Sequence, residues 1–137
     1  MPLFRRASHA SVAPEFAETL RAFRVTLRHV EDAKASLVLA VRSGRIQGIP
    51  LASGLSAFEE GLRRAFDSMR AWRRPETDEH WRACEHALSD ALQRARRLRL
   101  ERSPETYEEL IGEVGDLLDP LEAFSEASAG VRSFEHG

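Results

Sequence analysis

The sequence is short of the residues on which disulfides, many metal sites and membrane spans depend. Its 137 residues include one cysteine, Cys84. A single cysteine excludes an internal disulfide and a four-cysteine zinc site. No apolar run approaches the roughly 20 residues that span a bilayer, so we expect no membrane span. The single cysteine also fits a reducing compartment, and we expect the protein to be cytoplasmic.

Lysine is almost absent, because Lys34 is the only lysine among 20 basic residues and the others are arginine. Arginine and the abundant alanine both have GC-rich codons, so base composition accounts for this bias. The net charge is −2, whereas nucleic-acid binders usually carry a basic excess. We therefore expect no nucleic-acid partner.

The densest basic cluster does not indicate a nucleic-acid partner either. It consists of Arg94, Arg96, Arg97, Arg99 and Arg102. At about 100° per residue these side chains spread around a helix and do not form one stripe. Cations also favour the last turns of a helix, and acidic partners follow at once in the sequence. A structural role is favoured over phosphate contacts.

Motifs for catalysis and for metal binding are also missing. None of the five histidines has a glutamate three residues before it, as the di-iron carboxylate bundles require. There is no glycine-rich phosphate loop with lysine and no G-x-S-x-G sequence. His80 and Cys84 have a spacing that shares a helix face, but zinc needs three or four ligands. The sequence assigns no catalytic, cofactor-binding or metal-ligating residue and favours a protein that is not an enzyme.

Apolar residues recur at spacings of three, four and seven residues along most of the chain, which puts an apolar face on each of four helices. Pro14, Pro50 and Pro104 suit first helical turns. No segment alternates apolar and polar residues as strands do. We predict an all-α, up-down antiparallel four-helix bundle with helices at about 14–42, 50–73, 76–100 and 104–118.

A proline interrupts the last apolar stripe. A proline inside a helix costs about 3 kcal/mol, whereas Asp119, Pro120 and Glu122 together suit a helix start. The sequence therefore predicts a kink or break at Asp119–Pro120 and a short fifth helix at about 120–129. We expect one domain at 14–130, a flexible arm at 1–13 and a loose tail at 131–137.

The stretch SGRIQGIPLASG, residues 43–54, contains two competing helix starts. Ser56 and Glu59 form a capping box, which leaves a loop of about 13 residues. Pro50 leaves an ordinary short connection and gives a helix long enough to cover the first one. We predict the start at Pro50, with Ser56 as the alternative. The remaining loop tip offers Arg45 and Gln47 as candidates for contact with a ligand or partner.

Lys34 lies on the apolar stripe of the first helix, between Val30 and Leu37. A lysine buried there would be a candidate for ligand binding or catalysis. In the other interpretation Ala33 takes the core position, because a 3.6-residue period drifts past a strict heptad, and Lys34 reaches solvent at the edge. The second interpretation is favoured.

Two further patterns bear on association. Small residues recur along one side of the second helix, where they let another helix approach closely: Gly54, Ala57, Gly61, Ala65 and Ser68. Charge is also uneven, with 19 basic and 13 acidic residues at 1–102 but one basic and nine acidic residues at 103–137. We expect the acidic segment to lie beside basic parts of the same chain or of a second copy.

These features favour a non-catalytic helical bundle that serves as a protein–protein interaction or self-association module, with a homodimer as the expected form. The alternative is a small-molecule or lipid-binding bundle with its site near Lys34 and the core aromatics. A helical nuclease or other enzyme comes third. Arg24 and His29 have the Arg-x4-His spacing of HEPN-type ribonucleases, yet on one helix they point about 140° apart.

Overall fold

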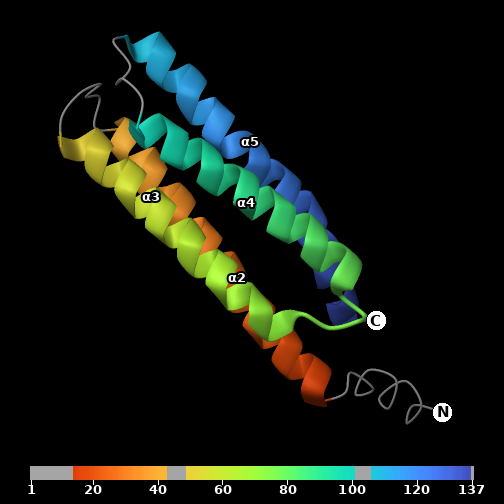
Figure 1. Ribbon diagram of the computed structural model, residues 1–137. Helices are drawn as coiled ribbons and strands as arrows, with labels where there is room; N and C mark the ends of the chain where they lie inside the picture. The colour runs from red at the N-terminus through yellow and green to blue at the C-terminus, as the bar shows by residue number, and fades with distance from the viewer. Residues whose placement is uncertain (1–13, 43–48, 101–105, 137) are drawn as a thin grey trace.

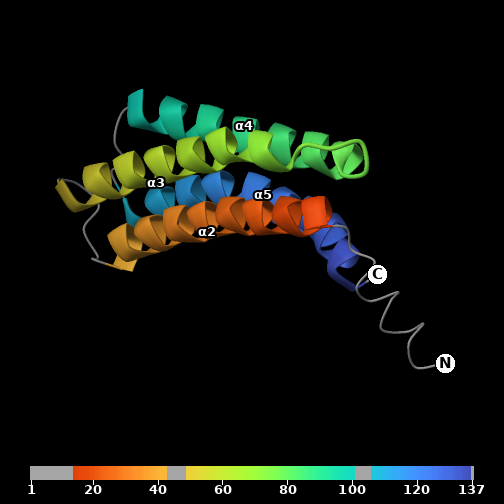
Figure 2. The same ribbon diagram turned by 90° about the horizontal axis from the view of Figure 1, so that it is seen from below.

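The computed structural model describes residues 14–42, 49–100 and 106–136, and nearly all of them are helical. The four long helices are α2 (Pro14–Arg42), α3 (Ile49–Ser68), α4 (Asp78–Leu100) and α5 (Tyr107–Arg132), with 3-10 turns η1 (Met69–Trp72) and η2 (Ser133–His136). They lie side by side along one long axis as two hairpins, α2–α3 and α4–α5 (Figure 1), and in the view from below α5 is partly hidden behind α3 and α2 (Figure 2). The predicted all-α up-down bundle is confirmed.

The end of α2 and the start of α3 lie where the sequence predicted them. α2 has the predicted bounds, and α3 begins at Ile49, so that Pro50 falls in its first turn. Ser56, the alternative start, lies inside the helix, and the preceding Leu55 is buried.

α5 begins at Tyr107 and not at 104, because the Thr106 side chain accepts a hydrogen bond from the backbone N–H of Glu109.

Small residues at seven-residue intervals bring α2 and α3 together. The facing pairs are Ala40–Gly54, Ala33–Gly61 and Thr26–Ser68. A Cβ atom added to Gly61 would lie 2.8 Å from the Cβ of Ala33, so the two backbones approach more closely than larger side chains allow. Most of the small-residue stripe of α3 is thus used inside the chain, although Ala57 remains exposed.

The polar pair in this contact belongs to a hydrogen-bond relay. Trp72 Nε1 donates to Thr26 Oγ1 at 2.9 Å, and Ser68 Oγ donates to the carbonyl of Ala65 at 2.7 Å. Since Ser68 uses its only proton there, the Thr26 hydroxyl donates to Ser68 Oγ, at 2.5 Å. Each donor of the relay therefore has an acceptor, as buried polar groups require.

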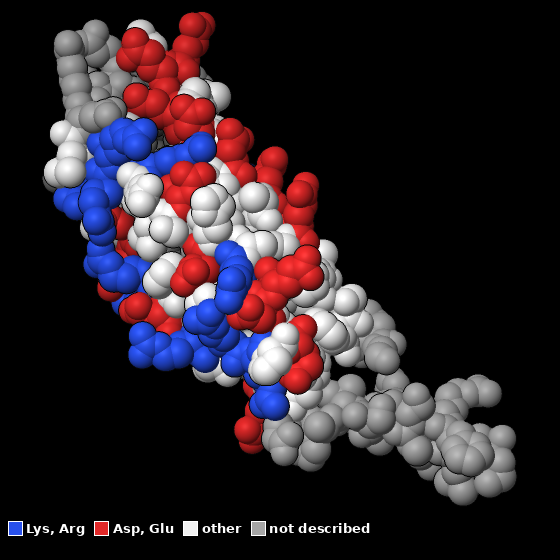
Figure 3. Space-filling model, turned by 45° about the vertical axis from the view of Figure 1, so that its right-hand side comes forward, with Lys and Arg blue, Asp and Glu red and all other residues white. Residues whose placement is uncertain are grey.

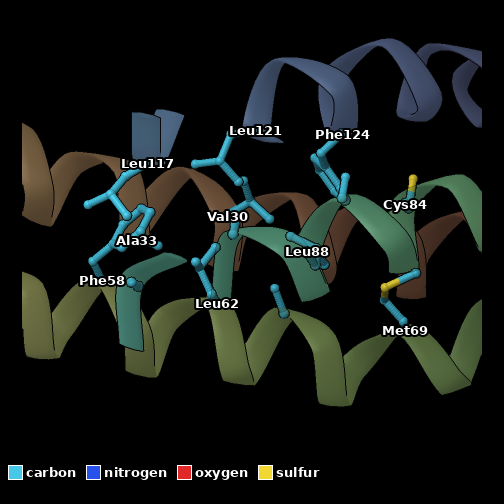
Figure 4. Packing of buried hydrophobic residues seen from close by; sticks show 14 of the residues in the cluster. Val30, Ala33, Phe58, Leu62, Met69, Cys84, Leu88, Leu117, Leu121 and Phe124 are labelled. Atoms are coloured by element: carbon cyan, nitrogen blue, oxygen red, sulfur yellow. The ribbon is translucent and has the colours of Figure 1, made fainter. Parts of the chain in front are cut away.

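The core is one continuous cluster to which all four helices contribute. Figure 4 shows side chains from each helix pointing into a shared interior, with Phe58 and Leu62 of α3 below Val30 of α2, and Leu117 and Leu121 of α5 above. Several of the largest side chains are fully buried: Phe23, Leu37, Phe58, Leu62, Trp72, Leu88, Leu110, Leu117 and Val131. The apolar stripes predicted from the sequence face this interior.

α5 continues through Pro120 to Arg132, so the predicted break and the separate helix at 120–129 are wrong. Proline has no N–H, and the carbonyl of Asp116 therefore loses its usual helical donor. Arg94 Nη1 of α4 donates to that carbonyl instead, at 2.7 Å. Leu121 and Phe124, just beyond the proline, are buried in the core. Packing and a replacement donor thus keep the helix continuous.

The C-terminal segment is also more ordered than the sequence suggested. Val131 is fully buried, and the rings of Phe134 and Phe16 pack edge to face with centroids 5.2 Å apart. The predicted loose tail is therefore wrong for residues 131–134. The predicted N-terminal arm at 1–13 lies outside the described residues.

Candidate functional site

The candidates named from the sequence do not form one site. Lys34 is on the edge of α2, with its side chain 41% exposed and its Nζ 3.9 Å from Oε1 of Glu31. Ala33 is buried in the core beside it. The structure therefore places alanine at the core position and lysine at the solvent edge. Arg45 and Gln47 lie outside the described residues.

His80 and Cys84 have separate environments. Burial raises the pKa of the Cys84 thiol to about 12, so it is protonated at neutral pH and lacks the thiolate that binds metals. The His80 imidazole lies against Gly130 and packs edge to face with Phe134, with ring centroids 6.3 Å apart. Within the described ranges, no three His, Cys, Asp or Glu residues are grouped so that they could hold a metal ion.

The core aromatics pack on one another. Phe23 and Trp72 meet edge to face with centroids 5.0 Å apart, and Trp72 and Trp81 do so at 6.5 Å. Trp81 Nε1 donates to the carbonyl of Met69 at 2.7 Å. Arg73 lies over the Trp81 ring, with Cζ 4.2 Å from its centroid. These contacts account for the aromatic residues as packing groups, with their polar atoms satisfied.

Two facing segments of the α2–α3 hairpin carry no charged residue. Residues 35–41 of α2 and 49–58 of α3 contain no charged side chain. We define the hairpin face as Ala35, Ser36, Val38 and Leu39 of α2 with Ser53 and Ala57 of α3. Leu39 is 71% exposed and Val38 is 40% exposed. A groove between the two helices is lined by Ser36, Leu39, Ala40, Arg42, Ser53, Gly54 and Ala57.

Three arginines surround a buried carboxylate between α3 and α4. The Glu59 side chain is 7% exposed, and its Oε2 accepts from Arg99 Nε at 2.8 Å. Its Oε1 lies 3.4 Å from Arg63 Nη2 and 3.7 Å from Arg96 Nε. We call Arg63, Arg96 and Arg99 the arginine clamp. A buried carboxylate requires such partners, since an unpaired charge in the interior is costly.

Acidic side chains follow the outer side of α5. We define the acidic ridge as Glu108, Asp116, Asp119, Glu122 and Glu126, all of which are exposed. Figure 3 shows acidic residues along one edge of the molecule and basic residues gathered along the opposite edge. No ion pair between described residues involves a carboxylate of the ridge. The ridge carboxylates thus point to solvent.

Sequence reasoning missed the hairpin face and the arginine clamp. Val38 and Leu39 lie off the apolar stripe of α2, and their signal was the absence of charge over two facing segments. Glu59 stands next to the stripe residue Phe58, and its partner Arg99 is 40 residues away. The sequence alone gives no register between α3 and α4 and therefore no such pairing.

Comparison of the chain with protein-family models, curated proteins and solved structures finds no match. Across the described ranges, no helix combines the length and the apolar character that crossing a membrane requires. The surfaces of the chain itself are therefore the features that bear on its function.

Proposed function

We propose that this chain is a non-catalytic association module that pairs with a second copy of itself through the hairpin face. The observation that carries the proposal is Leu39, a large apolar residue that is 71% exposed on a face whose defining residues are uncharged, with Arg42 at its edge. Covering apolar surface contributes about 25 cal/mol per Å². Contiguous exposed apolar surface on a folded domain is typical of an interaction site.

The shape of the hairpin face supports the same function. Gly54 and Ala57 keep the α3 side of the groove low, and Leu39 rises on the α2 side. An apolar side chain of a partner would enter the groove while Leu39 packs against the partner's surface. Neither event buries a charged group, except at the edge where Arg42 lies, so little desolvation opposes the contact.

Charge distinguishes this face from the rest of α2. Val25 is also exposed, at 49%, but three arginines lie within four residues of it along the helix, Arg21, Arg24 and Arg28, whereas Leu39 has one, Arg42. Covering Val25 would bring those charged groups into the contact. Val25 therefore provides a matched control for Leu39, since both are exposed apolar residues of the same helix.

The test compares Leu39→Glu with Val25→Glu by native mass spectrometry and sedimentation velocity, after circular dichroism has shown both variants to be helical. Leu39→Glu should weaken self-association by at least about tenfold, because it buries an unpaired charge in the contact. Val25→Glu should associate as the wild type does. Equal association of both variants would contradict the proposal.

A further inference from the structure

The arginine clamp has more donors than its carboxylate uses. Arg96 and Arg99 both approach Glu59 through Nε, and their Nη groups make no hydrogen bond to any described residue. A guanidinium group has five N–H donors in a fixed plane. Glu59 therefore neutralises one of three positive charges and holds two guanidinium groups in position, with further donors available at the surface.

Such donors fit a carboxylate. Arginine pairs with carboxylates through two parallel hydrogen bonds, which gives both strength and orientation. The chain itself carries carboxylates that no described residue pairs, on the acidic ridge of α5. Asp119, Glu122 and Glu126 follow one another at spacings of three and four residues, so they lie on one side of the helix.

The ridge is also accessible to another helix. Between its acidic residues, the exposed positions include Gly112, Gly115 and Ala123. A Cβ atom added to Gly112 or Gly115 would meet nothing within 4 Å, so no packing inside the chain requires glycine there. Glycine is unfavourable in a helix, and an unoccupied close approach is one reason to find it.

We infer that the acidic ridge of one copy docks against the arginine clamp of a second copy. This inference rests on the proposed self-association and adds its orientation and its charge dependence. Ridge and clamp are different surfaces, and in a two-fold dimer each ridge meets the clamp of the other copy, so the contact occurs twice. The clamp adjoins the hairpin face along α3. Ser56 lines a surface hollow that also contains Arg63 and Arg99. The next residue, Ala57, lines the hairpin groove.

A charge-swap experiment tests this contact. The ridge variant carries Glu122→Lys and Glu126→Lys, both at exposed positions. The clamp variant carries Arg63→Glu and Arg96→Glu, which leaves the shortest contact of Glu59, with Arg99, in place. Each variant alone should associate at least about tenfold more weakly than the wild type, because like charges then face each other. An equimolar mixture should restore association and give the mixed mass in native mass spectrometry.

The matched control carries Glu18→Lys and Glu79→Lys, which produce the same change in net charge at exposed positions of α2 and α4 outside the hairpin face, the ridge and the clamp. It should associate as the wild type does. Raising the salt concentration from about 50 mM to about 500 mM should weaken wild-type association by at least about tenfold, since exposed charges are screened. If the clamp variant does not fold, the ridge variant, its control and the salt series still test the contact.

The outcomes separate this inference from the proposed function. One outcome is that Leu39→Glu abolishes association while the ridge and clamp variants associate like the wild type. That result would contradict the contact between ridge and clamp and would support self-association through the hairpin face. The contact is likewise overturned if the control loses as much association as the ridge variant. If the wild type forms no species heavier than a monomer, both proposals fall.

Discussion

Arg94 Nη1 donates to the backbone carbonyl of Asp116 at 2.7 Å, and that carbonyl is the one that Pro120 leaves without a helical donor. Arg94 is also held by Asp90, whose Oδ1 accepts from Arg94 Nε at 3.2 Å. The side chain of one helix thus repairs the hydrogen-bond ladder of its neighbour. Because α5 stays continuous, Leu121 and Phe124 keep their places in the core.

A double-mutant cycle measures this repair. Arg94→Met should lower the free energy of unfolding by about 1–2 kcal/mol, because the Asp116 carbonyl loses its donor. In a Pro120→Ala background the restored N–H serves that carbonyl, so the same substitution should cost about 1 kcal/mol less. Urea unfolding of the four proteins gives the coupling. Additive effects within error would show that Arg94 does not serve the carbonyl.

Two glycines should respond to alanine with opposite signs. Gly61→Ala should destabilise the fold by about 1–3 kcal/mol, because the new Cβ lies 2.8 Å from the Cβ of Ala33 and forces α2 and α3 apart. Gly115→Ala meets nothing within 4 Å and should stabilise the folded monomer by up to about 1 kcal/mol through helix propensity. Thermal unfolding at low protein concentration compares the two. Effects of the same sign would contradict the close packing of α2 on α3.

The buried thiol should make stability fall at alkaline pH. In the unfolded chain the Cys84 thiol ionises from its ordinary pKa of 9.0, whereas burial raises its pKa to about 12 in the folded protein. The thiol contribution is therefore fully present below about pH 9 and is lost as the pH rises towards 12, by at most about 1.4 kcal/mol per pH unit.

Cys84→Ala isolates this contribution, because lysine, tyrosine and arginine titrate alike in both proteins. Urea unfolding between about pH 8 and about pH 11 should give the wild type a steeper loss of stability than the variant. If the free energy of unfolding changed with pH equally in the wild type and in the variant, the thiol would be in contact with solvent. A thiol reagent should in turn modify native Cys84 far more slowly than the urea-unfolded chain.

The sequence was sufficient for the parts of the fold that local patterns determine. The apolar stripe and Pro14 predicted α2 within its observed bounds, and Pro50 predicted the first turn of α3. It failed at Pro120, because the donor that repairs α5 stands 22 residues away on another helix. It also failed at Phe134, whose partner Phe16 is near the other end of the chain. Such contacts depend on tertiary register, which periodicity does not encode.

The candidate surfaces likewise divide into features that local patterns predict and features that depend on tertiary register. Periodicity correctly favoured Ala33 over Lys34 for the core position. The clamp around Glu59 depends on how α3 aligns with α4, and the exposure of Leu39 depends on which side of α2 the other helices leave uncovered. Both are properties of the assembled bundle.

The most direct test of the central claim is sedimentation velocity of the wild-type protein from about 1 μM to about 100 μM, a range that brackets ordinary self-association constants. A module that pairs through the hairpin face should show a mass that rises with concentration from the 15.4 kDa of one chain towards at least twice that value. A single species of 15.4 kDa at every concentration would contradict the account.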